Sequence, residues 1–118
     1  MTYRRKQLGA SGEDLAANYL EKIGYEIIER NKRFKFGEID IIACYGDYVV
    51  LVEVKTKTSL AQGRPEEEVD YFKQKKLRLL ARALEQIYPK NNIRIDVVAV
   101  DKTEFTPKIN HIINAVEA

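Results

Sequence analysis

Two runs rich in β-branched residues, 38–44 and 48–55, stand on either side of a short turn and constrain the fold more than any other feature. Gly46 and Asp47 are typical of the two-residue loop of a tight antiparallel hairpin. Counting outwards from this loop gives the opposed pairs Tyr45–Tyr48, Ala43–Val50, Ile42–Leu51, Ile41–Val52 and Ile39–Val54. Both faces of the hairpin are therefore apolar near the turn, which predicts a sheet covered by helices on both sides.

The rest of the chain predicts an α/β domain with a mixed central β-sheet flanked by helices, in the order α-β-β-β-α-β-β. Basic or Gly- and Pro-containing segments at 31–36 and 56–67 are expected to be loops. Residues 1–8 are expected to be a basic, flexible arm, and residues 9–118 a single domain. The expected elements are a helix from Ser11 to about Ile23, a strand at 25–30, the two hairpin strands, a helix at about 67–88 with an apolar stripe of Val69, Phe72, Leu80, Ala83 and Ile87, and strands at 93–100 and 108–115.

Composition adds only weak limits on function. Lys plus Arg is 20 against 18 for Asp plus Glu, a net charge of +2 that by itself does not indicate a polyanionic partner. The one cysteine, Cys44, allows no internal disulfide and suits a reducing compartment. No run of about 18 apolar residues would span a membrane, and the basic start lacks the apolar core of a signal peptide. We therefore expect a cytoplasmic protein without a membrane partner.

Acidic side chains follow at the far end of the hairpin, where the same count opposes Asp40 with Glu53 and Glu38 with Lys55. Directly opposed Cβ atoms in an antiparallel pair lie roughly 5 Å apart, so two like charges there destabilise the sheet unless they are compensated. A divalent cation such as Mg²⁺, which takes carboxylate oxygens, would compensate them. The alternatives are a protonated carboxylate with a raised pKa, a solvated strand end, or salt bridges to Lys55 and Arg94.

Two further residues belong to the same hypothesis. Lys55 lies two residues after Glu53, so its side chain projects from the same face and could steady charge that develops on a scissile phosphate. A helix packed on this side could bring Glu13 towards the cluster, although a Glu in a first helical turn also favours the helix dipole. Glu38 could contact a metal or pair with Lys55.

Several short segments together resemble the YraN family of proteins. The resemblance covers nearly the whole chain after the basic arm. The segments that carry it are Gly12-Glu13, Gly37-Glu38-Ile39-Asp40, Val52-Glu53-Val54-Lys55, Lys73-Gln74, Arg94-Ile95-Asp96-Val97 and Asn114-Ala115.

That family is in turn similar to the restriction-endonuclease-like, PD-(D/E)xK fold, including archaeal Holliday-junction resolvases. The resemblance implies endonuclease cleavage of DNA phosphodiester bonds, in branched or repair DNA, with Mg²⁺ or Mn²⁺ as cofactor. Asp40, Glu53 and Lys55 match the catalytic motif, and Glu13 matches the N-terminal helical acid. The expected metal ligands are Asp40, Glu53, Glu13 and a backbone carbonyl at Val54. Because cutting two strands takes two sites, a homodimer is also expected.

Basic residues supply candidate nucleic-acid contacts. A loop carrying Lys32, Arg33 and Lys35 could hold a nucleic-acid backbone, with Phe34 and Phe36 either stacking on bases or packing in the core. Lys73 and Gln74 could touch a phosphate or only coat their helix. Lys57 stands where relatives often have Arg, which changes a bidentate phosphate contact to a point charge. Lys75, Lys76, Arg78 and Arg82 are interpreted as a solvated face.

Other residues are interpreted as structural, and two other functions stay open. Arg94 and Asp96 alternate with apolar residues along their strand and predict an ion pair. His111 has no evident metal partner, and Cys44 is expected to pack as a small hydrophobe. The alternatives to a nuclease are a non-catalytic nucleic-acid-binding module that retains the fold and a protein-interaction accessory domain.

Overall fold

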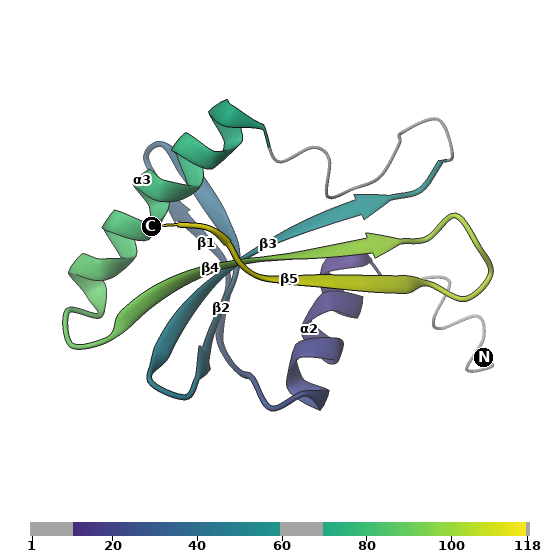
Figure 1. Ribbon diagram of the computed structural model, residues 1–118, viewed down its shortest axis with the longest axis horizontal. Helices are drawn as coiled ribbons and strands as arrows, with labels where there is room; N and C mark the ends of the chain where they lie inside the picture. The colour runs from purple at the N-terminus through teal and green to yellow at the C-terminus, as the bar shows by residue number, and fades with distance from the viewer. Residues whose placement is uncertain (1–10, 60–69, 118) are drawn as a thin grey trace.

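The computed structural model describes residues 11–59 and 70–117. Figure 1 shows one sheet between two helices. The predicted order of helices and strands is confirmed, while the basic arm predicted at 1–8 lies outside the described residues. The elements are α2 (Gly12–Lys22), β1 (Glu26–Phe34), β2 (Gly37–Tyr45), β3 (Tyr48–Lys57), α3 (Tyr71–Ile87), β4 (Asn92–Asp101) and β5 (Lys108–Val116).

The five strands form one mixed sheet in the order β1-β2-β3-β4-β5. Only β3 and β4 run parallel, and α3 makes the crossover between them. The other neighbouring pairs are antiparallel. The hairpin register counted from the sequence is confirmed from Tyr45–Tyr48 through Ile41–Val52.

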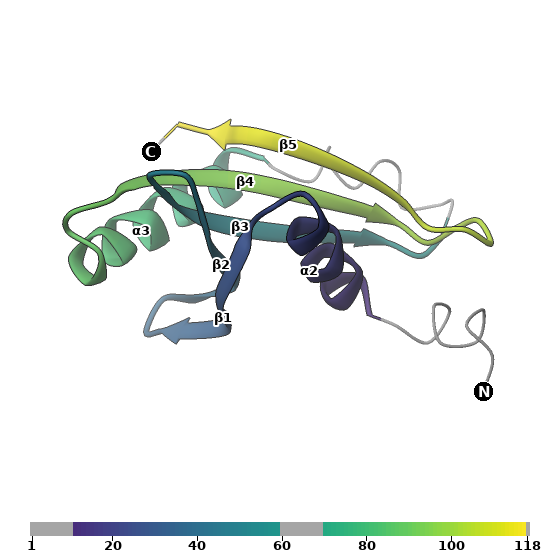
Figure 2. The same ribbon diagram turned by 90° about the horizontal axis from the view of Figure 1, so that it is seen from below.

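Each face of the sheet has its own apolar core, as the two-sided hairpin predicts. On one face Ala16 and Leu20 of α2 pack against Val50 and Val52 of β3. On the other face Leu77, Leu80 and Leu84 of α3 pack with Leu51. Figure 2 shows the two helices at separate places along the sheet. Fully burying one such leucine stabilises the fold by about 1.5–3 kcal/mol, so both helices are bound firmly. Neither described helix is long and apolar enough to cross a membrane.

The start of α2 lies unusually close to β3. Ser11 caps the helix, its hydroxyl oxygen accepting a hydrogen bond from the Asp14 N–H at 3.0 Å. A Cβ at buried Gly12 would stand 1.9 Å from Oγ1 of Thr56 in β3, so only glycine fits there. This close approach brings the first turn of α2, with Glu13, to the far end of β3.

Two predicted boundaries are wrong. Most of the loop expected at 31–36 is strand, because β1 continues to Phe34 beside β2, with Lys32 opposite Ile39 and Arg33 opposite Glu38. Basic residues are tolerated there because β1 is an edge strand. The loop expected from residue 56 begins later, since β3 extends to Lys57.

The apolar stripe predicted for α3 is also partly wrong. The helix buries Leu77, Leu80, Ala81 and Leu84. Phe72 is 78% exposed and Ile87 is 46% exposed, while Val69 lies outside the described residues. The buried stripe begins only at Leu77, nearly two turns after the helix starts, so the first turn of α3 extends beyond the core.

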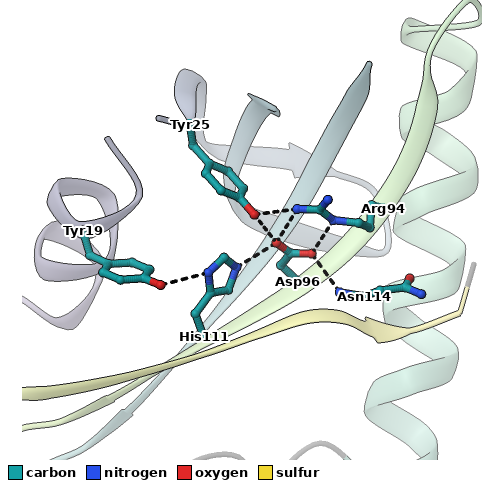
Figure 3. A network of polar contacts seen from close by, with 6 residues as sticks. All are labelled: Tyr19, Tyr25, Arg94, Asp96, His111 and Asn114. Atoms are coloured by element: carbon teal, nitrogen blue, oxygen red, sulfur yellow. Dashed lines mark hydrogen bonds and ion pairs between the residues drawn. The ribbon is translucent and has the colours of Figure 1, made fainter. Parts of the chain in front are cut away.

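A buried polar network joins α2, β4, β5 and the segment before β1 (Figure 3). The fully buried carboxylate of Asp96 is at its centre. Figure 3 also shows Tyr19 of α2 at the far side of the His111 ring, where Oη of Tyr19 lies 3.1 Å from Nδ1 of His111. The partners of Asp96 are Arg94 Nε at 2.9 Å, His111 Nε2 at 2.8 Å, the Tyr25 hydroxyl at 3.0 Å and the Asn114 backbone N–H at 3.0 Å.

This network keeps Asp96 ionised. Burial raises the pKa of Asp96, but hydrogen bonds from His111, Arg94 and the Asn114 N–H outweigh it and hold the pKa at about 2. The predicted Arg94–Asp96 ion pair is therefore confirmed. The prediction that His111 is structural agrees with its position between Asp96 and Tyr19.

We expect Asp96→Asn to lower the free energy of unfolding by about 3 kcal/mol at neutral pH, because it leaves Arg94 buried without its counter-charge. The folded-state pKa of Asp96 is below its usual 3.8, so its stabilisation is present above that value and is lost as pH falls towards 2. The difference between the variants should therefore shrink in acid. Urea unfolding at several pH values measures it, with Asp47→Asn in the exposed hairpin turn as control. Equal stability at neutral pH would contradict this account.

Candidate functional site

The hairpin pairing stops at Asp40. The last opposed pair of β2 and β3 is Ile41–Val52, and beyond it the two strands part (Figure 1). The predicted backbone pairings of Asp40 with Glu53 and of Glu38 with Lys55 are therefore wrong. Instead, Oδ2 of Asp40 accepts a hydrogen bond from the backbone N–H of Val54 at 2.8 Å. The carboxylate thus satisfies a donor that the departing strand leaves open.

The alternation of β2 also breaks at this residue. Ile41 belongs to the core under α2, whereas Ile39 belongs with Ile42 to the core under α3. Strict alternation from the turn places Ile39 with Ile41, and that prediction is wrong. The strand therefore turns at Asp40, between the two cores.

Glu53 is almost fully buried in β3, with 5% of its surface exposed. Two lysines reach the same oxygen: Nζ of Lys73 lies 2.8 Å from Oε1, and Nζ of Lys55 lies 3.6 Å from it. Lys55 was expected on this face, two residues along β3. Lys73 arrives from α3, and the sequence indicated only a phosphate contact or a surface position for it.

These lysines leave part of the acidic charge uncompensated. Burial and then the charge of Glu53 raise the pKa of Asp40 to about 6, against the lowering effect of the Val54 N–H. The charge of Glu13 raises this pKa further, and that of Lys73 lowers it. The structure therefore brings Asp40, Glu53 and Glu13 into one electrostatic neighbourhood.

Glu13 is held in place by residues of β1. Its Oε1 accepts hydrogen bonds from Nε of Arg30 at 2.9 Å and from Nδ2 of Asn31 at 3.0 Å. Arg30 also bonds Asp14 at 2.7 Å, so one guanidinium ties β1 to the first turn of α2. Asn31 has a φ of 57°, a backbone conformation that asparagine tolerates better than most residues. The sequence predicted Arg30 at the end of a strand and Asn31 in a loop, and indicated no part in the site for either residue.

The amine of Lys73 keeps its positive charge in the site, because its pKa is raised. Burial lowers the pKa of Lys73, but the hydrogen bond to Glu53 and the charges of Glu53 and Asp40 raise it above its usual value overall. The sequence signal for this role is weak: Lys73 follows Phe72, close to the apolar stripe predicted for this helix.

Two of the other predicted basic residues form ion pairs with acids other than Asp40 and Glu53. Lys32 is 3.8 Å from Glu29, and the largely exposed Arg33 is 3.4 Å from Glu38. Glu38 is therefore paired across the β1–β2 register, not with Lys55 as one reading proposed. The remaining predicted contacts are Lys35 in the β1–β2 turn, Lys57 opposite Asp101 at the end of β3, and Gln74 beside Lys73 on α3.

A divalent cation fits this donor set only as an open, two-carboxylate site. Within residues 11–59 and 70–117, no three His, Cys, Asp or Glu side chains are grouped to hold a metal. Mg²⁺ is commonly bound through one or two carboxylates, with water and substrate phosphate completing its shell. Burial and then the charge of Glu53 raise the pKa of Asp40, and a bound cation would lower it again. Hard oxygen donors with uncompensated charge suit Mg²⁺ or Mn²⁺.

Comparison with known proteins identifies relatives along most of the chain. Residues 12–100 match the family described as Uncharacterised protein family UPF0102. The chain is 50% identical over 95 residues to a UPF0102 protein of Rhodococcus opacus, covering 79% of this chain and 80% of the relative. It is 43% identical over 117 residues to one of Caldanaerobacter subterraneus, covering 94% and 95%. The chain therefore belongs to the UPF0102 family, the family to which the YraN resemblance pointed.

Proposed function

We propose that this protein is a divalent-metal-dependent endonuclease of the restriction-endonuclease-like kind, which hydrolyses DNA phosphodiester bonds. One observation carries the proposal: Asp40 is fixed by the Val54 N–H where β2 leaves β3, and there its burial and then the charge of the neighbouring Glu53 raise its pKa to about 6. Asp96, which stabilises the fold, differs in this respect: its hydrogen-bond donors lower its pKa to about 2. The order of helices and strands and the sequence resemblance support the same assignment.

Asp40 and Glu53 would hold the cation. The backbone carbonyl of Val54 is the further ligand we propose, while Glu13, held by Arg30 and Asn31, acts on Asp40 through its charge. A bound Mg²⁺ or Mn²⁺ would supply Lewis-acid polarisation of the scissile phosphate and a more acidic water.

Three groups of the protein would orient the carboxylates and stabilise charge on the phosphate. The Val54 N–H fixes one oxygen of Asp40 and so orients the carboxylate. Lys55, 3.6 Å from Glu53, is placed to stabilise negative charge that develops on the phosphate. Lys73 holds Glu53 in the same way from α3 and is a positioning residue in this proposal.

A non-catalytic nucleic-acid-binding module is the second candidate. The contact of both Lys55 and Lys73 with Oε1 of Glu53 favours it, because this contact neutralises that carboxylate without a metal. The two candidates differ over Asp40, which only the nuclease requires as an ionised ligand.

We expect the purified protein to cut supercoiled or four-way-junction DNA with Mg²⁺ or Mn²⁺ and to be inactive with chelator. Asp40→Asn and Glu53→Gln should each lower the rate at least about 100-fold, since each removes charge on which transition-state stabilisation depends. Asp47→Asn, in the exposed hairpin turn, is the matched control and should cut normally. Cleavage that survives both chelator and Asp40→Asn would contradict the proposal. Salt-sensitive DNA binding without any cleavage would favour the second candidate.

The raised pKa of Asp40 should make the stability of the protein depend on pH. Its folded-state pKa is above its usual 3.8, so between 3.8 and about 6 the folded protein binds more protons than the unfolded chain. Stability therefore falls as pH rises through this window, and the full penalty is present above it. Asp40→Asn removes the charge and can still accept from Val54. In chelator, it should raise the free energy of unfolding near pH 8 by about 1–2 kcal/mol, a value reduced for partial exposure.

Urea unfolding of both proteins measures this difference. It should disappear near pH 4, where the Asp40 carboxyl is already protonated in the folded state. A loss of stability in Asp40→Asn near pH 8, or a gain of the same size near pH 4, would contradict an uncompensated carboxylate at this position.

A further inference from the structure

The first turn of α3 exposes two aromatic rings beside the acidic site. Phe72 is 78% exposed and Tyr71 is 67% exposed, and their rings meet edge to face with centroids 5.6 Å apart. Phe72 directly precedes Lys73, whose amine contacts Glu53 at 2.8 Å. The two rings form a contiguous apolar patch next to Lys73, and exposed apolar patches bordered by polar residues mark interaction sites.

Lysines accompany these rings. Lys75 and Lys76 are exposed and lie three and four residues after Phe72, so they share its side of the helix. Lys76 extends towards the β1–β2 turn, since its Cε lies 2.7 Å from the place a Cβ would take on Gly37. The helix face and the turn are therefore neighbours.

The β1–β2 turn adds a third ring and another cation. Phe36 is 47% exposed and stacks on Phe34 with centroids 6.0 Å apart, and Lys35 beside it is exposed. We call the surface made by these side chains the aromatic-basic rim. Its members are Lys35, Phe36, Tyr71, Phe72, Lys75 and Lys76.

We infer that the substrate of the proposed nuclease site carries unpaired DNA bases next to the cleaved phosphate, and that these bases stack on the aromatic-basic rim. The inference rests on the proposed function. Exposed rings interleaved with cations match the two parts of a single strand, π-faces and phosphates. Bases inside a duplex are stacked on one another and offer no free face to Phe72. A protein partner would cover the rings but would not require the surrounding lysines.

Binding should be measured in chelator, so that cleavage does not intervene. Fluorescence anisotropy with labelled oligothymidylate, which has unpaired bases, is compared with a duplex of equal length. We expect tighter binding of the single strand, and Phe72→Ala should weaken it at least about fivefold while changing duplex binding little. Phe72→Tyr keeps a ring and should bind normally, whereas Phe72→Leu, apolar but without a ring, should not. Ile87→Ala, an exposed apolar residue at the other end of α3, is the matched control.

The outcomes separate this inference from the proposed function. Equal affinity for single strand and duplex, or a Phe72→Leu variant as good as wild type, would overturn the stacking inference even if Mg²⁺-dependent cleavage is found. Single-strand preference that depends on the ring at 72, in a protein that never cuts DNA, would support base stacking and overturn the nuclease. Folding of each variant is checked by urea unfolding, which an exposed side chain should not alter.

Discussion

The hydrogen bond from the Val54 N–H to the Asp40 carboxylate is the contact on which the candidate site depends. A hairpin that continued its pairing past Ile41 would use this N–H in its ladder, and no side chain would be drawn to it. Because β2 turns away instead, Asp40 satisfies the open donor and is fixed next to Glu53. The close approach of α2 at Gly12 and the reach of Lys73 from α3 then bring charges of both helices to the same place.

Buried Asp96 and half-buried Asp40 have opposite electrostatic surroundings. Asp96 is surrounded by donors that outweigh its burial, and its pKa falls to about 2. Asp40 has one backbone donor, and burial followed by the charges of Glu53 and Glu13 raises its pKa to about 6. The first arrangement stabilises the fold, while the second lowers stability at neutral pH. A destabilised acid in a protein that otherwise compensates its buried charges is typical of a functional position.

Much of this arrangement could be predicted from sequence, and the exceptions have physical reasons. The Gly46-Asp47 turn fixed the register of β2 and β3, and two apolar faces predicted helices on both sides. The count failed at Asp40 because a strand can turn where a side chain replaces a ladder bond, which no periodicity records. Lys73 and His111 depend on contacts across helix and sheet packing, between residues far apart in the chain. Phe72 was misplaced because an exposed ring on a helix looks like a core residue when only spacing is known.

The central claim is that Asp40 lies beside Glu53 in a setting that disfavours its ionised form until a cation binds. Carbon-13 NMR of the Asp40 side-chain carboxyl tests it directly, as a pH titration in chelator and then with Mg²⁺. The account predicts a midpoint near pH 6 in chelator that moves lower when Mg²⁺ replaces the proton as compensating charge. A midpoint near 3.8 in chelator, or one near 6 that Mg²⁺ leaves unchanged, would contradict it.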